Sequence, residues 1–146
     1  SNYALQLGSD CPFFVSSTAC HATGRGEIFS PLTLSLSNYQ LVLIHPGIHI
    51  STAWAFNQIT PHQHPISTLQ LVQLPIEQWK NTLINDFEKS VLIAHPKLDA
   101  LQSMLYQNGA TYVSMSGSGS SFFALFPLTI NQQDLTIPSS YRIDFI

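Results

Sequence analysis

The feature that most constrains the fold is a nearly unbroken apolar run at residues 39–45, which the turn dipeptide Pro46-Gly47 ends. A short run of this kind is typical of a strand buried on both faces. Further strands are predicted near the C-terminus, on either side of a Gly/Ser turn and in a final alternating segment: residues 111–115, 122–126 and 141–146. The chain therefore contains a sheet that other elements must cover.

Two longer helices are predicted between these strands. In the first, apolar residues recur at every fourth position: Trp79, Leu83, Phe87 and Val91. His95-Pro96 would end this helix. Three leucines share one face of the second, which Asn108-Gly109 would end: Leu98, Leu101 and Leu105. Strands at both ends with helices between them indicate an α+β fold, with helices packed on one face of a mostly antiparallel sheet.

Shorter elements are predicted elsewhere. The first forty residues predict short strands at residues 12–15, 19–23 and 27–29, separated by Ser and Gly. Ser51 is a candidate N-cap for a short helix that runs through Phe56.

Composition excludes several classes of protein. The 146 residues carry a net charge of −3, and five scattered Lys and Arg residues form no basic patch, which argues against nucleic-acid binding. No apolar run is long enough to span a membrane, and the N-terminus lacks the features of a signal peptide. Two cysteines are too few for a disulfide scaffold and predict reduced thiols in a cytoplasmic protein.

The charged fraction of 9% is low and has two interpretations. The surface is either rich in neutral polar residues, or it packs in part against another domain.

The first candidate functional motif is residues 7–14, which contain Asp10. An Asp after Gly-Ser and just before a Pro is ordinary turn chemistry, in which the carboxylate caps backbone amides. The alternative is a carboxylate that accepts a proton from a substrate hydroxyl.

The second motif is residues 45–56. In a helix that begins after Ser51, Thr52 and Phe56 lie four residues apart on one face. They either hydrogen-bond and stack on a base or sugar, or serve the helix itself, with Phe56 in the core and Thr52 at the cap.

The third motif is the Gly/Ser segment at residues 114–121. Glycines let the backbone approach a phosphate, and successive amides can form an anion-binding nest. The alternative is a flexible turn between two strands. No Lys follows the glycines, so this is not a Walker A loop. His62-Gln63-His64 has no carboxylate or Cys nearby in the sequence, and no metal site is predicted.

Taken together and in this order, the motifs resemble the 4-diphosphocytidyl-2-C-methyl-D-erythritol kinase family of the GHMP kinase superfamily. The resemblance extends from about residue 3 to residue 126. The segments that carry it are residues 7–14, 22–27, 45–56, 85–88, 96–101 and 115–119.

The resemblance implies a fold and an activity. Residues 37–146 would form the ferredoxin-like α+β C-terminal domain of a GHMP kinase, and residues 1–36 would be the last strands of its N-terminal domain. The enzyme would transfer the γ-phosphate of ATP to a substrate hydroxyl in non-mevalonate isoprenoid biosynthesis, with Mg²⁺ as the expected metal.

The resemblance also implies residue roles. Asp10 would be the catalytic aspartate. Thr52 and Phe56 would bind the cytidine end of the substrate, Phe56 by stacking on cytosine. A set of small residues would support the loop that binds the nucleotide phosphates: Ser116, Gly117, Ser118, Gly119 and Ser120.

Two family motifs are absent from these 146 residues: the strand that supplies a catalytic lysine and the Gly-rich loop that binds ATP phosphates. We therefore expect a fragment that is inactive without an N-terminal kinase half, and that self-associates through apolar surface near residues 1–35. Two alternatives stay open: another GHMP kinase with a different alcohol substrate, and a non-catalytic binding module with the same fold.

Overall fold

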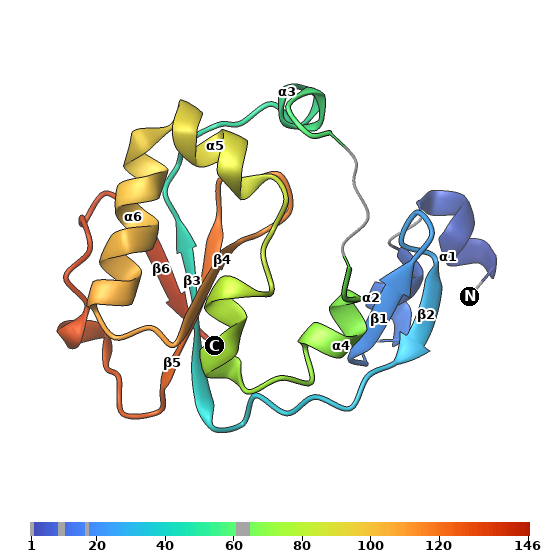
Figure 1. Cartoon of the computed structure of the whole chain (residues 1–146), viewed down its shortest axis with the longest axis horizontal. Coiled ribbons are helices and arrows are strands. Elements are labelled where there is room, and N and C mark those ends of the chain that lie inside the picture. The colour runs from blue at the N-terminus through green and yellow to red at the C-terminus, as the bar shows by residue number, and fades with distance from the viewer. Residues whose placement is uncertain (1, 9–10, 17, 61–64) are drawn as a thin grey trace. The chain divides into compact units, whose positions relative to one another are not determined.

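In a computed structural model of the chain, the described residues are 2–8, 11–16, 18–60 and 65–146 (Figure 1). They belong to two compact units, Ser1–Ser35 and Leu36–Ile146. No helix in this described part of the chain has the length and apolar content needed to cross a membrane.

The first unit contains two short helices and a two-stranded antiparallel sheet. The helices are α1 (Asn2–Leu7) and α2 (Cys11–Ser16), and the strands are β1 (Cys20–Thr23) and β2 (Ile28–Pro31). The two strands confirm the predictions at residues 19–23 and 27–29. The strand predicted at residues 12–15 is wrong, because this segment is α2. Pro12 lies in the first turn of that helix, where a missing N–H breaks no helical hydrogen bond.

The second unit is built on a four-stranded antiparallel sheet. Its strands are β3 (Tyr39–His45), β4 (Tyr112–Met115), β5 (Phe122–Pro127) and β6 (Arg142–Phe145), in the order β4-β5-β3-β6. With β3 counted as the first strand, this is the ferredoxin-like order. The strands predicted from residues 39–45, 111–115, 122–126 and 141–146 are confirmed.

The core lies on one face of this sheet. Val42 and Ile44 of β3 are fully buried there. The helices α5 (Glu88–Ala94) and α6 (Pro96–Gln107) cover this face (Figure 1). The three leucines predicted to share a face of α6 all lie in the core. Between β5 and β6 the chain forms only the short 3-10 helix η2 (Gln132–Asp134).

The long helix predicted around Trp79–Val91 is wrong in its first half. The chain instead forms the 3-10 helix η1 (Ile76–Asn81), and α5 begins only at Glu88. A side chain of β4 keeps the segment between η1 and α5 out of a helical conformation. The Tyr112 hydroxyl donates to the Leu83 carbonyl at 2.6 Å, and burial raises the pKa of Tyr112 to about 12, so this hydroxyl keeps its proton. The apolar repeat marks a buried surface here, not a continuous helix.

The remaining helices are α3 (Thr52–Asn57) and α4 (Thr68–Leu71). Ser51 is the N-cap of α3 as predicted, since its side chain accepts a hydrogen bond from the Trp54 amide at 3.3 Å.

Candidate functional site

The second and third motifs meet in the structure. The hydroxyl oxygens of Thr52, in the first turn of α3, and Ser118, in the loop between β4 and β5, lie 3.2 Å apart. The two residues are separated by 66 positions in the sequence. Folding therefore brings together two segments that the sequence could only present as separate candidates.

The Gly/Ser loop, defined here as residues 116–121, is a compact turn. The Ser116 amide donates to the Ser121 carbonyl at 2.8 Å, and the Gly119 amide donates to the Ser116 carbonyl at 3.0 Å. The Ser120 hydroxyl donates to the Ile48 carbonyl, which anchors the loop to the chain ahead of α3. The loop is therefore ordered by its own backbone and by a contact to the second motif.

Gly119 cannot be replaced without disturbing this loop. Its φ of +94° lies in the left-handed region that favours glycine. A Cβ at this position would lie 2.7 Å from Met115 Sδ and 2.8 Å from Ile50 Cδ1. The backbone conformation thus favours glycine here, and any side chain would also displace the ends of the Met115 and Ile50 side chains.

Several amides of the Gly/Ser loop are available to a ligand. Among the described residues, the amides of Gly117, Ser118 and Ser120 have no hydrogen-bond acceptor. Backbone amides in a glycine-containing turn are suited to bind an anion such as a phosphate. The loop therefore has groups that fit the phosphate-binding interpretation.

Phe56 is not a core residue, so that alternative for the second motif is wrong. Its side chain is 61% exposed. Its ring packs edge to face on Phe87, with centroids 4.9 Å apart and planes at 76°. The contact orients the ring and leaves much of it accessible for stacking.

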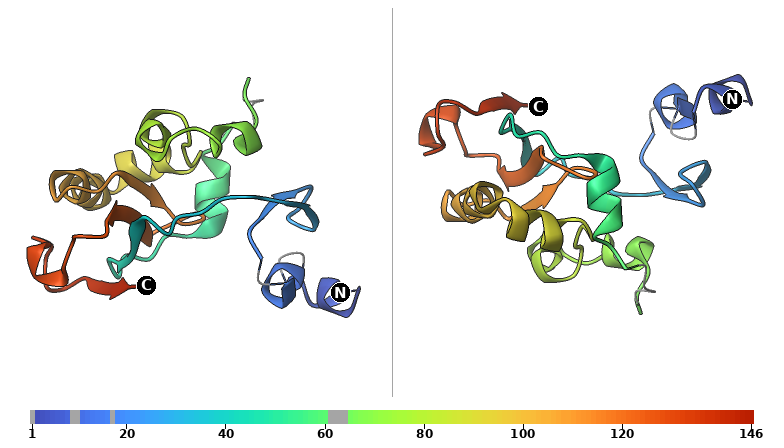
Figure 2. Two further views of the ribbon diagram at one scale, coloured as in Figure 1. Left: turned by 90° about the horizontal axis from the view of Figure 1, so that it is seen from below. Right: turned by 90° about the horizontal axis from the view of Figure 1, so that it is seen from above.

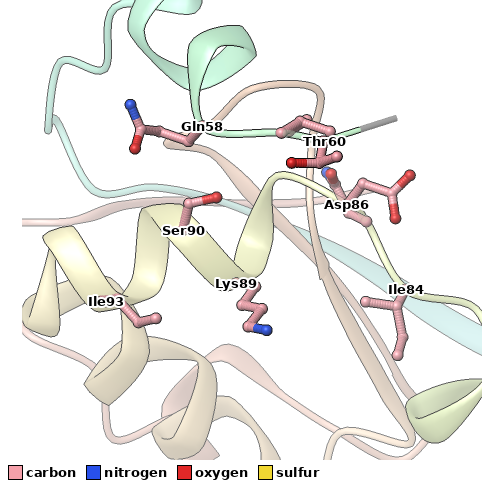
Figure 3. Close-up of a pocket in the computed structure, with 9 residues that line it drawn as sticks. Gln58, Thr60, Ile84, Asp86, Lys89, Ser90 and Ile93 are labelled. Atoms are coloured by element: carbon pink, nitrogen blue, oxygen red, sulfur yellow. The ribbon is translucent and has the colours of Figure 1, made fainter. Parts of the chain in front are cut away.

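A groove with a volume of about 500 Å³ lies next to this helix (Figure 3). One side is formed by Gln58 and Thr60, which follow α3, and the other by residues of α5 and the segment before it. Lys89 of α5 is the one cationic side chain among the lining residues. The groove thus extends the accessible surface beyond Phe56 and contains both apolar and polar groups.

Two sequence candidates lie outside the described residues: Asp10 and the segment His62-Gln63-His64. Within the described ranges, no group of three or more His, Cys, Asp or Glu side chains is arranged to hold a metal ion.

Comparison with known proteins finds a family match within the second unit. The family "GHMP kinases C terminal" matches residues 71–135. These residues are therefore similar to the C-terminal domain of GHMP kinases. The antiparallel sheet with helices on one face agrees with this assignment, and the α+β prediction is confirmed.

Similar proteins extend the likeness beyond this domain. The chain is 48% identical over 124 residues to a 4-diphosphocytidyl-2-C-methyl-D-erythritol kinase of Bacteroides fragilis, a match that covers 85% of this chain and 45% of the relative. A kinase of the same name from Parabacteroides distasonis is 42% identical over 134 residues and is covered to 49%. The chain thus spans about half the length of the curated relatives it matches.

A solved structure gives the same result. The crystal structure of a 4-(cytidine 5'-diphospho)-2C-methyl-D-erythritol kinase superposes with a TM-score of 0.70 at 28% sequence identity, over 83% of this chain and 45% of that one.

The sequence predicts no role for two residues that hold the Gly/Ser loop. The Asn85 amide donates to the carbonyls of Met115 at 2.7 Å and Gly117 at 2.8 Å. Glu88 accepts the Met115 amide at 2.6 Å. The segment 85–88 was matched to the family, but the pairing of these side chains with a strand some thirty positions away has no local signal.

Asn85 provides a test of how the loop is held. We expect Asn85→Asp to lower the free energy of unfolding by about 2 kcal/mol, because a carboxylate replaces a donor that faces two carbonyl oxygens. Asn85→Ala should cost less, and Asn81→Asp, an exposed position at the end of η1, should be nearly neutral. Urea unfolding checks this order of stabilities, and the bonded amides of Ser116 and Gly119 should exchange faster in the Asn85 variants. Equal stability of the Asn85 and Asn81 variants would contradict this role.

Proposed function

We propose that this GHMP kinase C-terminal domain is part of an ATP-dependent kinase that phosphorylates a hydroxyl of 4-diphosphocytidyl-2-C-methyl-D-erythritol in non-mevalonate isoprenoid biosynthesis. The observation that carries the proposal is the contact between Thr52 and Ser118. It joins the helix that presents Phe56 to the loop with available amides, so one site offers an aromatic ring and anion-binding groups. The names of the similar proteins support this substrate.

At the cytidine end, Phe56 would stack on the base and Thr52 would donate or accept a hydrogen bond. Stacking needs an aromatic face that is both accessible and fixed, and the exposed ring packed against Phe87 meets both requirements. The groove lined by Gln58 and Lys89 adjoins this position and gives polar contacts for the rest of the substrate.

At the nucleotide end, residues 116–120 would brace the ATP phosphates. The amides of Gly117, Ser118 and Ser120 supply donors, and the left-handed conformation of Gly119 allows the turn that carries them. ATP supplies the transferred phosphoryl group, whose charge Mg²⁺ neutralises in reactions of this class. The described residues contain no cluster that could hold a metal ion, and none of them is proposed as a Mg²⁺ ligand.

Asp10 would orient the substrate hydroxyl and accept its proton. The proposal places the catalytic lysine and the ATP phosphate loop on a kinase half outside these 146 residues, since neither motif occurs in them. The 146-residue chain alone should therefore show no phosphate transfer. Its two unpaired cysteines favour a cytoplasmic location.

The aromatic contact is tested in the kinase that contains this domain. Phe56→Leu should raise KM for the cytidylyl substrate about 10-fold, because one base-stacking contact contributes roughly 1–3 kcal/mol. Phe56→Tyr keeps the ring and should stay within about 2-fold, and KM for ATP should be unchanged in both variants. Steady-state kinetics measures these constants. An unchanged KM in Phe56→Leu would contradict the stacking role, and comparable turnover of an alcohol without cytidine would favour another GHMP kinase activity.

A further inference from the structure

The two outer edges of the four-stranded sheet differ. The edge of β4 is closed by side chains. The Tyr106 hydroxyl accepts from the Val113 amide at 3.2 Å and donates to the Val113 carbonyl at 3.3 Å. The Glu88 carboxylate accepts the Met115 amide at 2.6 Å. Backbone groups that would attract another strand are thus already bonded on this side.

The edge of β6 is open. The Ile146 amide donates to the Leu41 carbonyl at 3.0 Å, so alternate residues of β6 point their backbone groups toward β3. By this alternation, the backbone amides and carbonyls of Ile143 and Phe145 point away from the sheet. Among the described residues, none of these groups has a hydrogen-bond partner. In both views of Figure 2, the strand that ends at C lies at the margin of the unit formed by residues 36–146.

The sequence around this edge is complementary to itself in reverse. Arg142 and Asp144 lie on either side of Ile143, and Tyr141 and Phe145 lie one position further out. If two copies pair antiparallel with Ile143 opposite Ile143, each Arg142 faces Asp144 of the other copy, and each Tyr141 faces Phe145. Opposite charges and aromatic pairs across strands stabilise a sheet.

The charges also select this register. Pairing centred on Asp144 would place two carboxylates directly opposite each other, which is unfavourable. Within one chain, Arg142 Nε lies 3.0 Å from Asp144 Oδ2, and the side chains are 76% and 34% exposed. Such an exposed pair contributes little, so Arg142 can exchange it for the carboxylate of a second copy at small cost. His45 Nε2 also lies near this carboxylate, at 3.5 Å from Asp144 Oδ2.

We propose that the protein forms a two-fold symmetric dimer in which β6 of one copy pairs antiparallel with β6 of a second copy around Ile143. The two sheets become one continuous eight-stranded sheet. The Ile143 amide of each copy donates to the Ile143 carbonyl of the other, which gives two hydrogen bonds. Each Phe145 amide donates to the backbone carbonyl of Tyr141 in the other copy. The contact is isologous and closes after two copies. It does not depend on the kinase function proposed above.

Charge reversal at the edge tests this arrangement. Sedimentation of the wild-type chain across a dilution series should show a species of twice 16.2 kDa. Arg142→Asp and Asp144→Arg should each weaken the dimer roughly 30-fold, because both cross-strand pairs then join like charges. The double variant should dimerise like wild type, and an equal mixture of the two single variants should form a heterodimer. Lys97→Asp, the same charge change at an exposed site on α6, should have no effect.

A second variant addresses the backbone contact. Ile143→Pro removes an outward N–H and leaves the β3–β6 hydrogen bonds in place, and it should abolish the dimer while the circular dichroism spectrum stays unchanged. A monomeric wild type would overturn the proposal. Association that is equally strong in all the charge variants would also overturn it, since contacts elsewhere, such as apolar surface of residues 1–35, would then be responsible.

Discussion

Replacing Glu88 by alanine is expected to lower the free energy of unfolding by about 3 kcal/mol or more. The carboxylate is only 9% exposed and accepts three hydrogen bonds. They come from the Met115 amide at 2.6 Å, the Ser114 hydroxyl at 3.1 Å and the Gln102 side-chain amide at 3.0 Å. Alanine leaves the buried Met115 amide without an acceptor and removes the bonds to Ser114 and Gln102, and the cost of the unsatisfied amide adds to the loss. Denaturant unfolding measures the change.

Glu88→Gln is the matched control. Its carbonyl oxygen can still accept from Ser114 and Met115, and the Gln102 amide can turn to present its own oxygen. This variant should therefore lose only about 1 kcal/mol, mainly the charge-assisted part of the bonds. If alanine and glutamine cost the same, the charge and not the set of hydrogen bonds would be the source of stability at this position.

The second large effect is expected on catalysis. In the kinase that contains this domain, Asp10→Asn should lower kcat about 10²- to 10⁴-fold, because an amide cannot accept the proton of the substrate hydroxyl. KM for both substrates should change little, since the side chain keeps its size and polarity. A coupled assay of ATP-dependent phosphorylation measures both constants.

Asp99→Asn, which makes the same change at an exposed site in the first turn of α6, is the control and should leave kcat unchanged. Full activity of the Asp10 variant would return Asp10 to the alternative role of a turn residue. It would leave the cytidine-site proposal for Phe56 standing, because that proposal rests on KM.

The strands of the second unit could be predicted because each is a short apolar or alternating segment bounded by turn residues, such as Pro46-Gly47 after β3. The N-cap at Ser51 and the helix boundary at Pro96 could be predicted as well, because each depends on neighbouring residues in the sequence. The helix predicted through Leu83 failed, because the Tyr112 hydroxyl of β4 bonds to the Leu83 carbonyl and the Asn85 side chain accepts the Phe87 amide within the segment itself. Tertiary contacts of this kind override propensity and cannot be seen in a local window.

The same distinction applies to the site. Thr52, Phe56 and the Gly/Ser loop were identified as candidates because each belongs to a compact motif. Their proximity, and the support from Asn85 and Glu88, depend on pairings between residues distant in the sequence. The role of Asp10 stays a prediction, since it lies outside the described residues.

The contact between Thr52 and Ser118 has a consequence for how two ligands would influence each other. A ligand that immobilises the Gly/Ser loop also restrains the first turn of α3 through the paired hydroxyls. The second ligand then has less conformational entropy to lose, so each should tighten the binding of the other by the same factor. Thr52→Val removes one hydroxyl at nearly constant shape, and it would convert coupled binding into two independent events.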